Sequence, residues 1–278
     1  MSNNLTKQHS ELPVRAKLDI YYLFSLIIAL LVGGASLIGI IYSSVVFPTE
    51  DLHGFMVTDV INLTIILPLL ILSLYLARAK KLIGLLFWPG AILMITYHYL
   101  SYVLGTPFSW LSILYYTILA GSIYLLIGLV STIDGEKIRS GLSGLLFEKL
   151  LGWVLIIFGG YMLYRFYGFW ANSLLKQQTM PASESAVIIT DFLLSPPLII
   201  CGLLLLKKKA LGYVGAVALY LKMSMLCLGL LLLFILSPIM TGISFAAVDF
   251  IVIAIFTVIF NIPLALIIRS VVRNQGNV

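Results

Sequence analysis

Residues 57–84 read VTDVINLTIILPLLILSLYLARAKKLIG and combine a long apolar run, a short basic connection and the start of a second apolar run. About 20 mostly apolar residues are enough for a helix to cross the bilayer, and the run at 57–77 has that length. The connection from Arg78 to Lys81 has room only for a tight turn, so the two runs are predicted to form an antiparallel hairpin of membrane helices. This hairpin indicates the fold class of the whole chain.

The same pattern recurs along all 278 residues, which are 61% hydrophobic and only 10% charged. Soluble domains carry about 25% charged residues, so lipid must be the solvent for much of this surface. We therefore predict one integral membrane domain, residues 1–278, built as an all-α bundle of about eight transmembrane helices. The predicted spans are 18–42, 57–77, 82–104, 108–132, 150–171, 187–206, 211–236 and 246–268.

The positive charges predict the orientation of these spans. With the N-terminus inside, the cytoplasmic segments hold fourteen of the seventeen Lys and Arg residues, Lys7 among them. The outer loops hold only Lys176, and the remaining two are inside spans. Such an excess in inner loops is the usual sign of cytoplasmic segments. We expect a multi-pass protein of the plasma (cytoplasmic) membrane with both termini in the cytoplasm, so its net charge of +6 does not indicate nucleic-acid binding.

The two halves of the chain carry similar signals in the same order. These signals are Gly33-Gly34, Thr58-Asp59, Pro68 and Lys80-Lys81 in the first half, and Gly159-Gly160, Thr190-Asp191, Pro196-Pro197 and Lys208-Lys209 in the second. They predict an internal repeat of four plus four spans, with half-repeats at about 18–132 and 150–268. Because each unit has an even number of spans, the copies point the same way and are related by an axis along the membrane normal.

Ionisable and amide side chains inside the spans are the candidates for solute binding or proton relay. A charge at the bilayer centre costs at least about 2.5–3.5 kcal/mol, so such residues are usually functional or paired. The candidates are Asp59, Asn62, His98, Arg165, Asp191, Lys222 and Asp249. Most of them are predicted to lie in the outer half of the membrane, in one polar cluster that opens outward.

Each acidic candidate also has a structural interpretation. Asp59, Asp191 and Asp249 are each predicted near the outer start of an inward-running helix, where a carboxylate caps free backbone N–H groups. Arg165 lies in a tyrosine-rich stretch and either extends to the lipid headgroups or pairs with one of the acids inside the bundle.

Two further candidates lie deeper or stand alone. Lys222 is predicted too far from either surface to reach it, so it needs a carboxylate, backbone carbonyls or a water-filled cavity. Asp191 is the first candidate partner and Asp249 the second. His98 begins a polar stripe with Ser101, Tyr102 and Gly105 at helical spacing, which predicts a face turned towards protein or water. It either packs by hydrogen bonding or relays protons.

Pro68 interrupts the second predicted span, and Pro196 with Pro197 interrupts the sixth. Each proline frees a backbone carbonyl and kinks its helix. Matched interruptions in two halves of a repeat are typical of a binding site at the repeat interface. The alternative is a kink that the membrane bundle tolerates.

The sequence leaves several functions open. The leading interpretation is a carrier of a small charged solute or ion. The alternative is a non-transporting scaffold, sensor or accessory subunit, and the third is an embedded enzyme that acts on lipid or quinone. No catalytic residue, metal ligand or cofactor is assigned, because the sequence has no phosphate loop, metal-binding His pair or nucleophile elbow. The bilayer is the expected partner, and the sequence indicates no particular protein partner.

Overall fold

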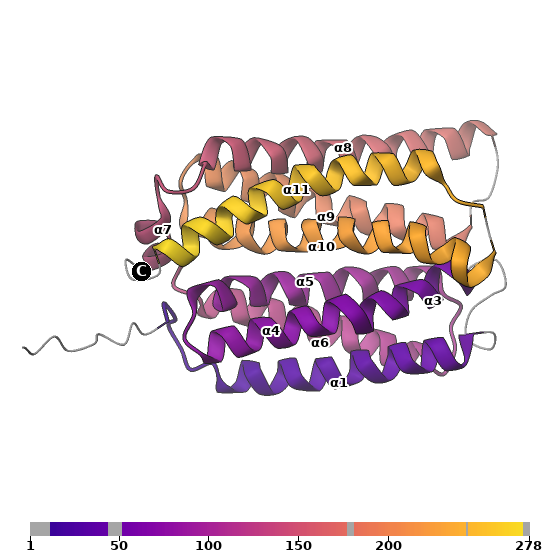
Figure 1. Cartoon of the computed structure of the whole chain (residues 1–278), viewed down its shortest axis with the longest axis horizontal. Helices are drawn as coiled ribbons and strands as arrows, with labels where there is room; N and C mark the ends of the chain where they lie inside the picture. The colour runs from indigo at the N-terminus through magenta and orange to yellow at the C-terminus, as the bar shows by residue number, and fades with distance from the viewer. Residues whose placement is uncertain (1–11, 44–51, 177–180, 243, 275–278) are drawn as a thin grey trace, which may run out of the picture.

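The computed structural model describes residues 12–43, 52–176, 181–242 and 244–274 (Figure 1). Lys7 lies outside the described residues. The helices are α1 (Asp19–Ile41), α3 (Leu52–Ile61), the π-helix η1 (Asn62–Ile66), α4 (Leu67–Arg78), α5 (Leu82–Gly105), α6 (Ser112–Thr132), α7 (Gly135–Leu142), α8 (Glu148–Lys176), α9 (Ala182–Leu206), α10 (Ala210–Thr241) and α11 (Ala247–Arg273). Within the described ranges no strand is found, which confirms the all-α prediction.

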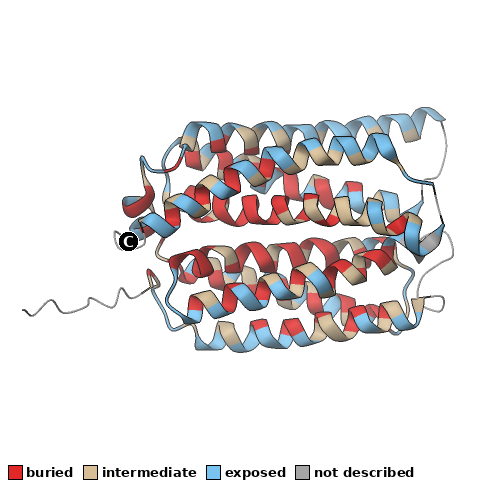
Figure 2. Ribbon diagram, viewed as in Figure 1, coloured by how far each residue is buried: buried red, intermediate tan, exposed pale blue. Residues whose placement is uncertain are grey.

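Eight helical segments are long and apolar enough to cross a membrane, with α3, η1 and α4 forming one of them. Each coincides with one predicted span, which suggests a multi-pass membrane protein. Large apolar side chains on the outside of the bundle, such as Leu30 at 78% exposed, fit this environment. Figure 2 shows exposed residues along α1, α8 and α11, while the buried residues concentrate on α5 and α10.

Two helices begin five residues earlier than predicted, and this changes the interpretation of their aspartates. The helix α3 begins at Leu52 instead of residue 57, and α9 begins at Ala182 instead of 187. Asp59 and Asp191 therefore lie well inside continuous helix, where backbone N–H groups already have partners. The capping interpretation is wrong for both residues. It remains possible only for Asp249, which lies in the first turn of α11.

The tight turns α4–α5 and α9–α10 have the same backbone geometry. Lys80 and Lys208 both adopt positive φ angles, 58° and 52°. The next residue in each turn donates its backbone N–H to a helix carbonyl, at 2.9 Å from Lys81 to Leu76 and 2.8 Å from Lys209 to Leu204. In each case a glycine, Gly84 or Gly212, then packs directly on the backbone of the preceding helix.

These two turns lie at one end of the bundle, which we call the basic end (residues 78–81 and 207–209, with the described chain ends). The N-terminal segment is fixed there by backbone hydrogen bonds of 2.8 Å from Arg15 N–H to the Thr132 carbonyl and from Asp134 N–H to the Pro13 carbonyl. The C-terminal end of α11 lies at the same end (Figure 1). With an even number of spans, both ends of the chain must lie at the same end of the bundle.

The prolines affect their helices differently. Pro68 is the second residue of α4, and the π-helix η1 ends two residues before it, so the second span is interrupted at this point. In contrast, α9 continues as an α-helix through Pro196 and Pro197. The Ser195 hydroxyl donates a 2.7 Å hydrogen bond to the Phe192 carbonyl, which is the carbonyl that Pro196 leaves without its helical donor. The predicted pair of interruptions is therefore present only in the first half.

Candidate functional site

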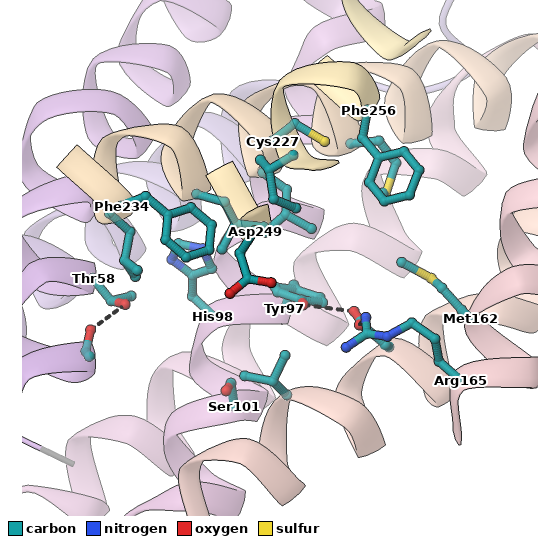
Figure 3. Close-up of a pocket in the computed structure, with 18 of the residues that line it drawn as sticks. Thr58, Tyr97, His98, Ser101, Met162, Arg165, Cys227, Phe234, Asp249 and Phe256 are labelled. Carbon is teal, nitrogen blue, oxygen red and sulfur yellow. Dashed lines mark hydrogen bonds and ion pairs between the residues drawn. The ribbon is translucent and has the colours of Figure 1, made fainter. Parts of the chain in front are cut away.

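A cavity of about 660 Å³ lies between α5 and the helices of the second half, and α3 completes its wall (Figure 3). Its lining residues come from the ends of these helices that lie away from the basic end. The charged and polar lining residues are Thr58, Tyr97, His98, Ser101, Tyr102, Tyr161, Arg165, Ser183, Asp191 and Asp249. Apolar and aromatic side chains, including Phe158, Phe234 and Phe256, cover much of the remaining wall.

Asp191 is the most heavily bonded acid in this wall. Its Oδ2 forms a 3.0 Å ion pair with Nη1 of Arg165, and its Oδ1 accepts a 2.8 Å hydrogen bond from the Tyr97 hydroxyl. The Asp191 side chain is 7% exposed, whereas that of Arg165 is 41% exposed. Of the two alternatives for Arg165, the structure shows the pairing with an aspartate inside the bundle.

Lys222 is buried behind this pair instead of taking part in it. The residue is 0% exposed, and its Nζ lies 3.5 Å from the centre of the Tyr97 ring. The Met223 sulfur is 3.7 Å from the same atom. Among the described residues no carboxylate lies within 4.0 Å of Nζ, so the expected ion pair with Asp191 or Asp249 is absent. Tyr97 separates Lys222 from the cavity and stabilises it by a cation–π contact.

His98 connects the cavity to a hydrogen-bonded chain in the first half. Its Nδ1 lies 2.7 Å from the Asn62 Oδ1, and the Asn62 amide donates a 3.2 Å hydrogen bond to the Ser36 hydroxyl. Ser101 and Tyr102 of the predicted stripe also line the cavity, and Gly105 packs against Phe55 and Ala186. The stripe therefore faces protein and cavity, as its spacing predicts.

Asp59 lies next to this chain but does not line the cavity. It is 1% exposed, and its Oδ1 accepts a 2.9 Å hydrogen bond from the Tyr102 hydroxyl. Ser36 and Asn62 are its other polar neighbours. Gly39 lies directly against its Oδ2, so closely that a Cβ on this glycine would overlap the oxygen.

Asp249 is the exposed acid of the cavity. In Figure 3 its carboxylate and the Arg165 guanidinium extend into the cavity from α11 and α8, with Tyr97 between them in this view. Asp249 forms no ion pair within the described parts of the chain. Its carboxylate therefore remains available to a ligand.

The structure thus places four of the seven candidate side chains in the wall of one cavity. Asn62 and Asp59 lie behind His98 and Tyr102, and Lys222 lies behind Tyr97. Sequence reasoning missed Tyr97 and Ser36. The run Tyr97-His98-Tyr99, with Ser101 and Tyr102 after it, was a usable signal, since so many hydroxyl and imidazole groups in one span need partners. Ser36 carried no such signal, because an isolated Ser is common in membrane helices.

Chemically, the site offers paired and free charges on an apolar wall, which suits binding better than bond-breaking. No group of three or more potential metal ligands occurs among the described residues. The cysteines Cys201 and Cys227 are free thiols. No family model, curated protein or solved structure matches this chain.

Proposed function

We propose that this protein is a carrier of small organic cations that binds its solute in the cavity between the two halves. The observation that carries the proposal is a large cavity with charged groups on its wall inside a bundle of membrane-spanning helices. Ligand sites of this size are mostly apolar and use a few polar groups to orient the ligand. Charged residues at membrane depth are typical of solute and ion pathways.

The charge of the solute follows from a count of the charged lining residues. Arg165 contributes one positive charge, and Asp191 and Asp249 contribute two negative charges, so one negative charge remains. Asp191 is already neutralised by Arg165, whereas Asp249 forms no ion pair with any residue that the structure describes. Phe234 and Phe256 line the same cavity, and aromatic faces stabilise organic cations. A small amine or quaternary ammonium with an apolar body matches both features.

The proposal includes the internal repeat, which three structural correspondences support. The turns at Lys80 and Lys208 share one geometry. Gly90 of α5 packs against Ala218 of α10, and these residues are 128 positions apart, as Lys80 and Lys208 are. An axis through this contact, along the membrane normal, would relate the halves 18–132 and 150–268.

The third correspondence concerns the aspartates. Gly39 and Arg165 each stand six residues after the first glycine of Gly33-Gly34 and Gly159-Gly160. Each contacts the aspartate of its own half, Gly39 meeting Asp59 and Arg165 meeting Asp191. The halves would thus share one architecture and differ in the side chain that meets the acid. We also propose that the basic end faces the cytoplasm of a plasma membrane, so that the cavity lies towards the outside.

A second candidate function is a non-transporting scaffold or accessory subunit. The specific observation in its favour is the deep burial of Asp59 and Lys222, which do not line the cavity. In that case these groups would serve only to fix helix packing. The carrier is the better proposal because the cavity wall keeps an unpaired carboxylate at Asp249.

Three probes with the same aromatic body and different charge test the proposed function: benzyltrimethylammonium, benzyl alcohol and benzoate. We expect the cation alone to raise the melting temperature of the purified protein, and we expect it alone to enter proteoliposomes faster than liposomes that lack the protein. Asp249→Asn should abolish both effects. Glu184→Gln is the matched control, because Glu184 is an exposed acid in the first turn of α9 and does not line the cavity.

Three results would contradict the carrier proposal. Preferential binding of benzoate would mean that Arg165, and not Asp249, sets the charge preference. Binding of the cation without uptake, or no binding of any probe, would favour the non-transporting function.

A further inference from the structure

Asp59 is a buried acid with no positively charged side chain beside it. It is 1% exposed, and no Lys, Arg or His of the described residues lies within 4.0 Å of its carboxylate. Its Oδ1 accepts a hydrogen bond from the neutral hydroxyl of Tyr102. The acid is therefore surrounded by dipoles and not by charge.

The helices α1 and η1 contribute neutral groups beside Asp59. The helix α10 also packs on α3, but its Lys222 lies more than 4.0 Å from the Asp59 carboxylate. The helix α1 presents Ser36 and Gly39, and η1 presents Asn62. The titratable groups that face it are all tyrosines, Tyr99 and Tyr102 of α5 and Tyr115 of α6. Three phenols and two polar uncharged side chains cannot balance a negative charge in a medium without water.

The balancing positive charge must then come from solution. We infer that Asp59 binds an exchangeable proton, which it takes from and returns to the cavity through the hydroxyl of Tyr102. A proton fits the space, because Gly39 closes one side of the carboxylate without leaving room for even a Cβ. A metal cation would need several oxygen ligands arranged around it.

Tyr102 is placed to carry out this exchange. It lines the cavity, and its hydroxyl donates to Asp59 at 2.9 Å. On loading, a hydronium ion in the cavity gives a proton to the phenolic oxygen while the original O–H proton moves to Asp59 Oδ1. The tyrosine ends neutral, the carboxylate becomes a carboxylic acid, and water is left in the cavity. Release runs in the reverse direction.

A proton site beside a solute cavity offers a way to couple the two. Tyr102 and His98 belong to the cavity wall and also contact Asp59 or its neighbour Asn62. A solute that pushes on this wall would change the surroundings of Asp59. This coupling rests on the proposed function, whereas the proton site itself does not.

Infrared spectroscopy of the purified protein without any solute tests the proton site directly. At neutral pH we expect a C=O stretching band of a protonated carboxylic acid that shifts in D2O. Asp59→Asn should remove the band, and Glu184→Gln should keep it. Tyr102→Phe should keep the band but slow its shift after transfer to D2O, since the route through the hydroxyl is lost.

The remaining outcomes overturn the inference. Absence of the band in the parent protein at neutral pH would mean that Asp59 is ionised. If the melting temperature then rises with NaCl in the parent but not in Asp59→Asn, the bound cation is sodium. If Tyr102→Phe exchanges as fast as the parent, the route does not use Tyr102. Because no solute is present, these results are independent of whether benzyltrimethylammonium binds.

Discussion

Asp59 and Asp191 share a local sequence and differ in what surrounds them. Each follows a threonine, and each accepts a hydrogen bond from a tyrosine of α5, Tyr102 or Tyr97. Asp191 lines the cavity and is paired with Arg165. Asp59 is enclosed, and the corresponding neighbour is Gly39. In the proposed repeat, Gly39 would take the place of Arg165, so Asp191 has a fixed cation beside it and Asp59 has a glycine.

The two aspartates could therefore have different roles in the proposed carrier. An acid that is paired with an arginine is held in place by that ion pair, so it can form part of a stable binding wall. An acid without a cation changes charge whenever a proton arrives or leaves, so it can respond to conditions. The predictions below test whether Arg165 and Gly39 are the cause of the difference.

The largest effect is expected for Arg165→Met. This change leaves Asp191 buried without a cation beside it, as Asp59 is. Removing one partner of a buried pair costs about 3–5 kcal/mol. Because the Arg165 side chain is 41% exposed, we expect a loss of about 2–3 kcal/mol in unfolding free energy after solvent screening. The measurement is thermal or denaturant unfolding in detergent micelles.

The double variant Arg165→Met with Asp191→Asn is the control for this prediction. It removes both charges and keeps a side chain that accepts a hydrogen bond from Tyr97, so most of the lost stability should return. An Arg165→Met protein as stable as the parent would show that the ion pair contributes nothing, and the comparison with Asp59 would lose its energetic basis.

Gly39→Ala should have the next largest effect. The added Cβ overlaps Asp59 Oδ2, and overpacking of this kind costs about 1–3 kcal/mol. Gly34→Ala in the same helix is the matched control, because a Cβ there meets nothing within 4 Å. Replacing glycine by alanine in a helix otherwise gains about 0.5–1 kcal/mol. Equal melting temperatures for the two variants would mean that Asp59 does not lie against Gly39.

Lys222→Met should be neutral or mildly stabilising, in contrast to what the sequence alone predicts. Without a carboxylate within 4.0 Å among the described residues, its removal leaves no ion pair broken. The change removes the desolvation cost of a buried charge, and loss of the cation–π contact with Tyr97 offsets about 2 kcal/mol of this gain. A melting temperature well below that of the parent would indicate an acid near Lys222 after all.

The smallest effects test the repeat itself. Lys80→Gly and Lys208→Gly each replace a residue with positive φ, a conformation that costs a non-glycine residue about 1–2 kcal/mol. After the higher chain entropy of glycine is subtracted, each variant should gain up to about 1 kcal/mol. Because the turns have the same geometry, the two gains should agree within experimental error. A gain in stability for one variant and a loss for the other would show that the two turns are not equivalent.

Much of the fold could be predicted from the sequence for a simple physical reason. Twenty apolar residues have no stable place except in lipid, and a helix is the one local structure that satisfies its own backbone there. The eight spans and the short turn at Arg78 to Lys81 follow from this. The helix starts at Leu52 and Ala182 did not, because their first turns contain polar residues that also suit a loop.

The sequence by itself determined that charges in the spans must find partners, and it named Asp59, Arg165, Asp191 and Lys222 as the residues at issue. Only the tertiary structure decided the partners. Arg165 reaches Asp191 because α8 packs on α9, Lys222 meets the Tyr97 ring because α10 packs on α5, and Asp59 meets Gly39 because α3 packs on α1. Charge content is a property of each residue, but pairing depends on which helix faces touch, and helix packing is set by contacts far apart in the chain.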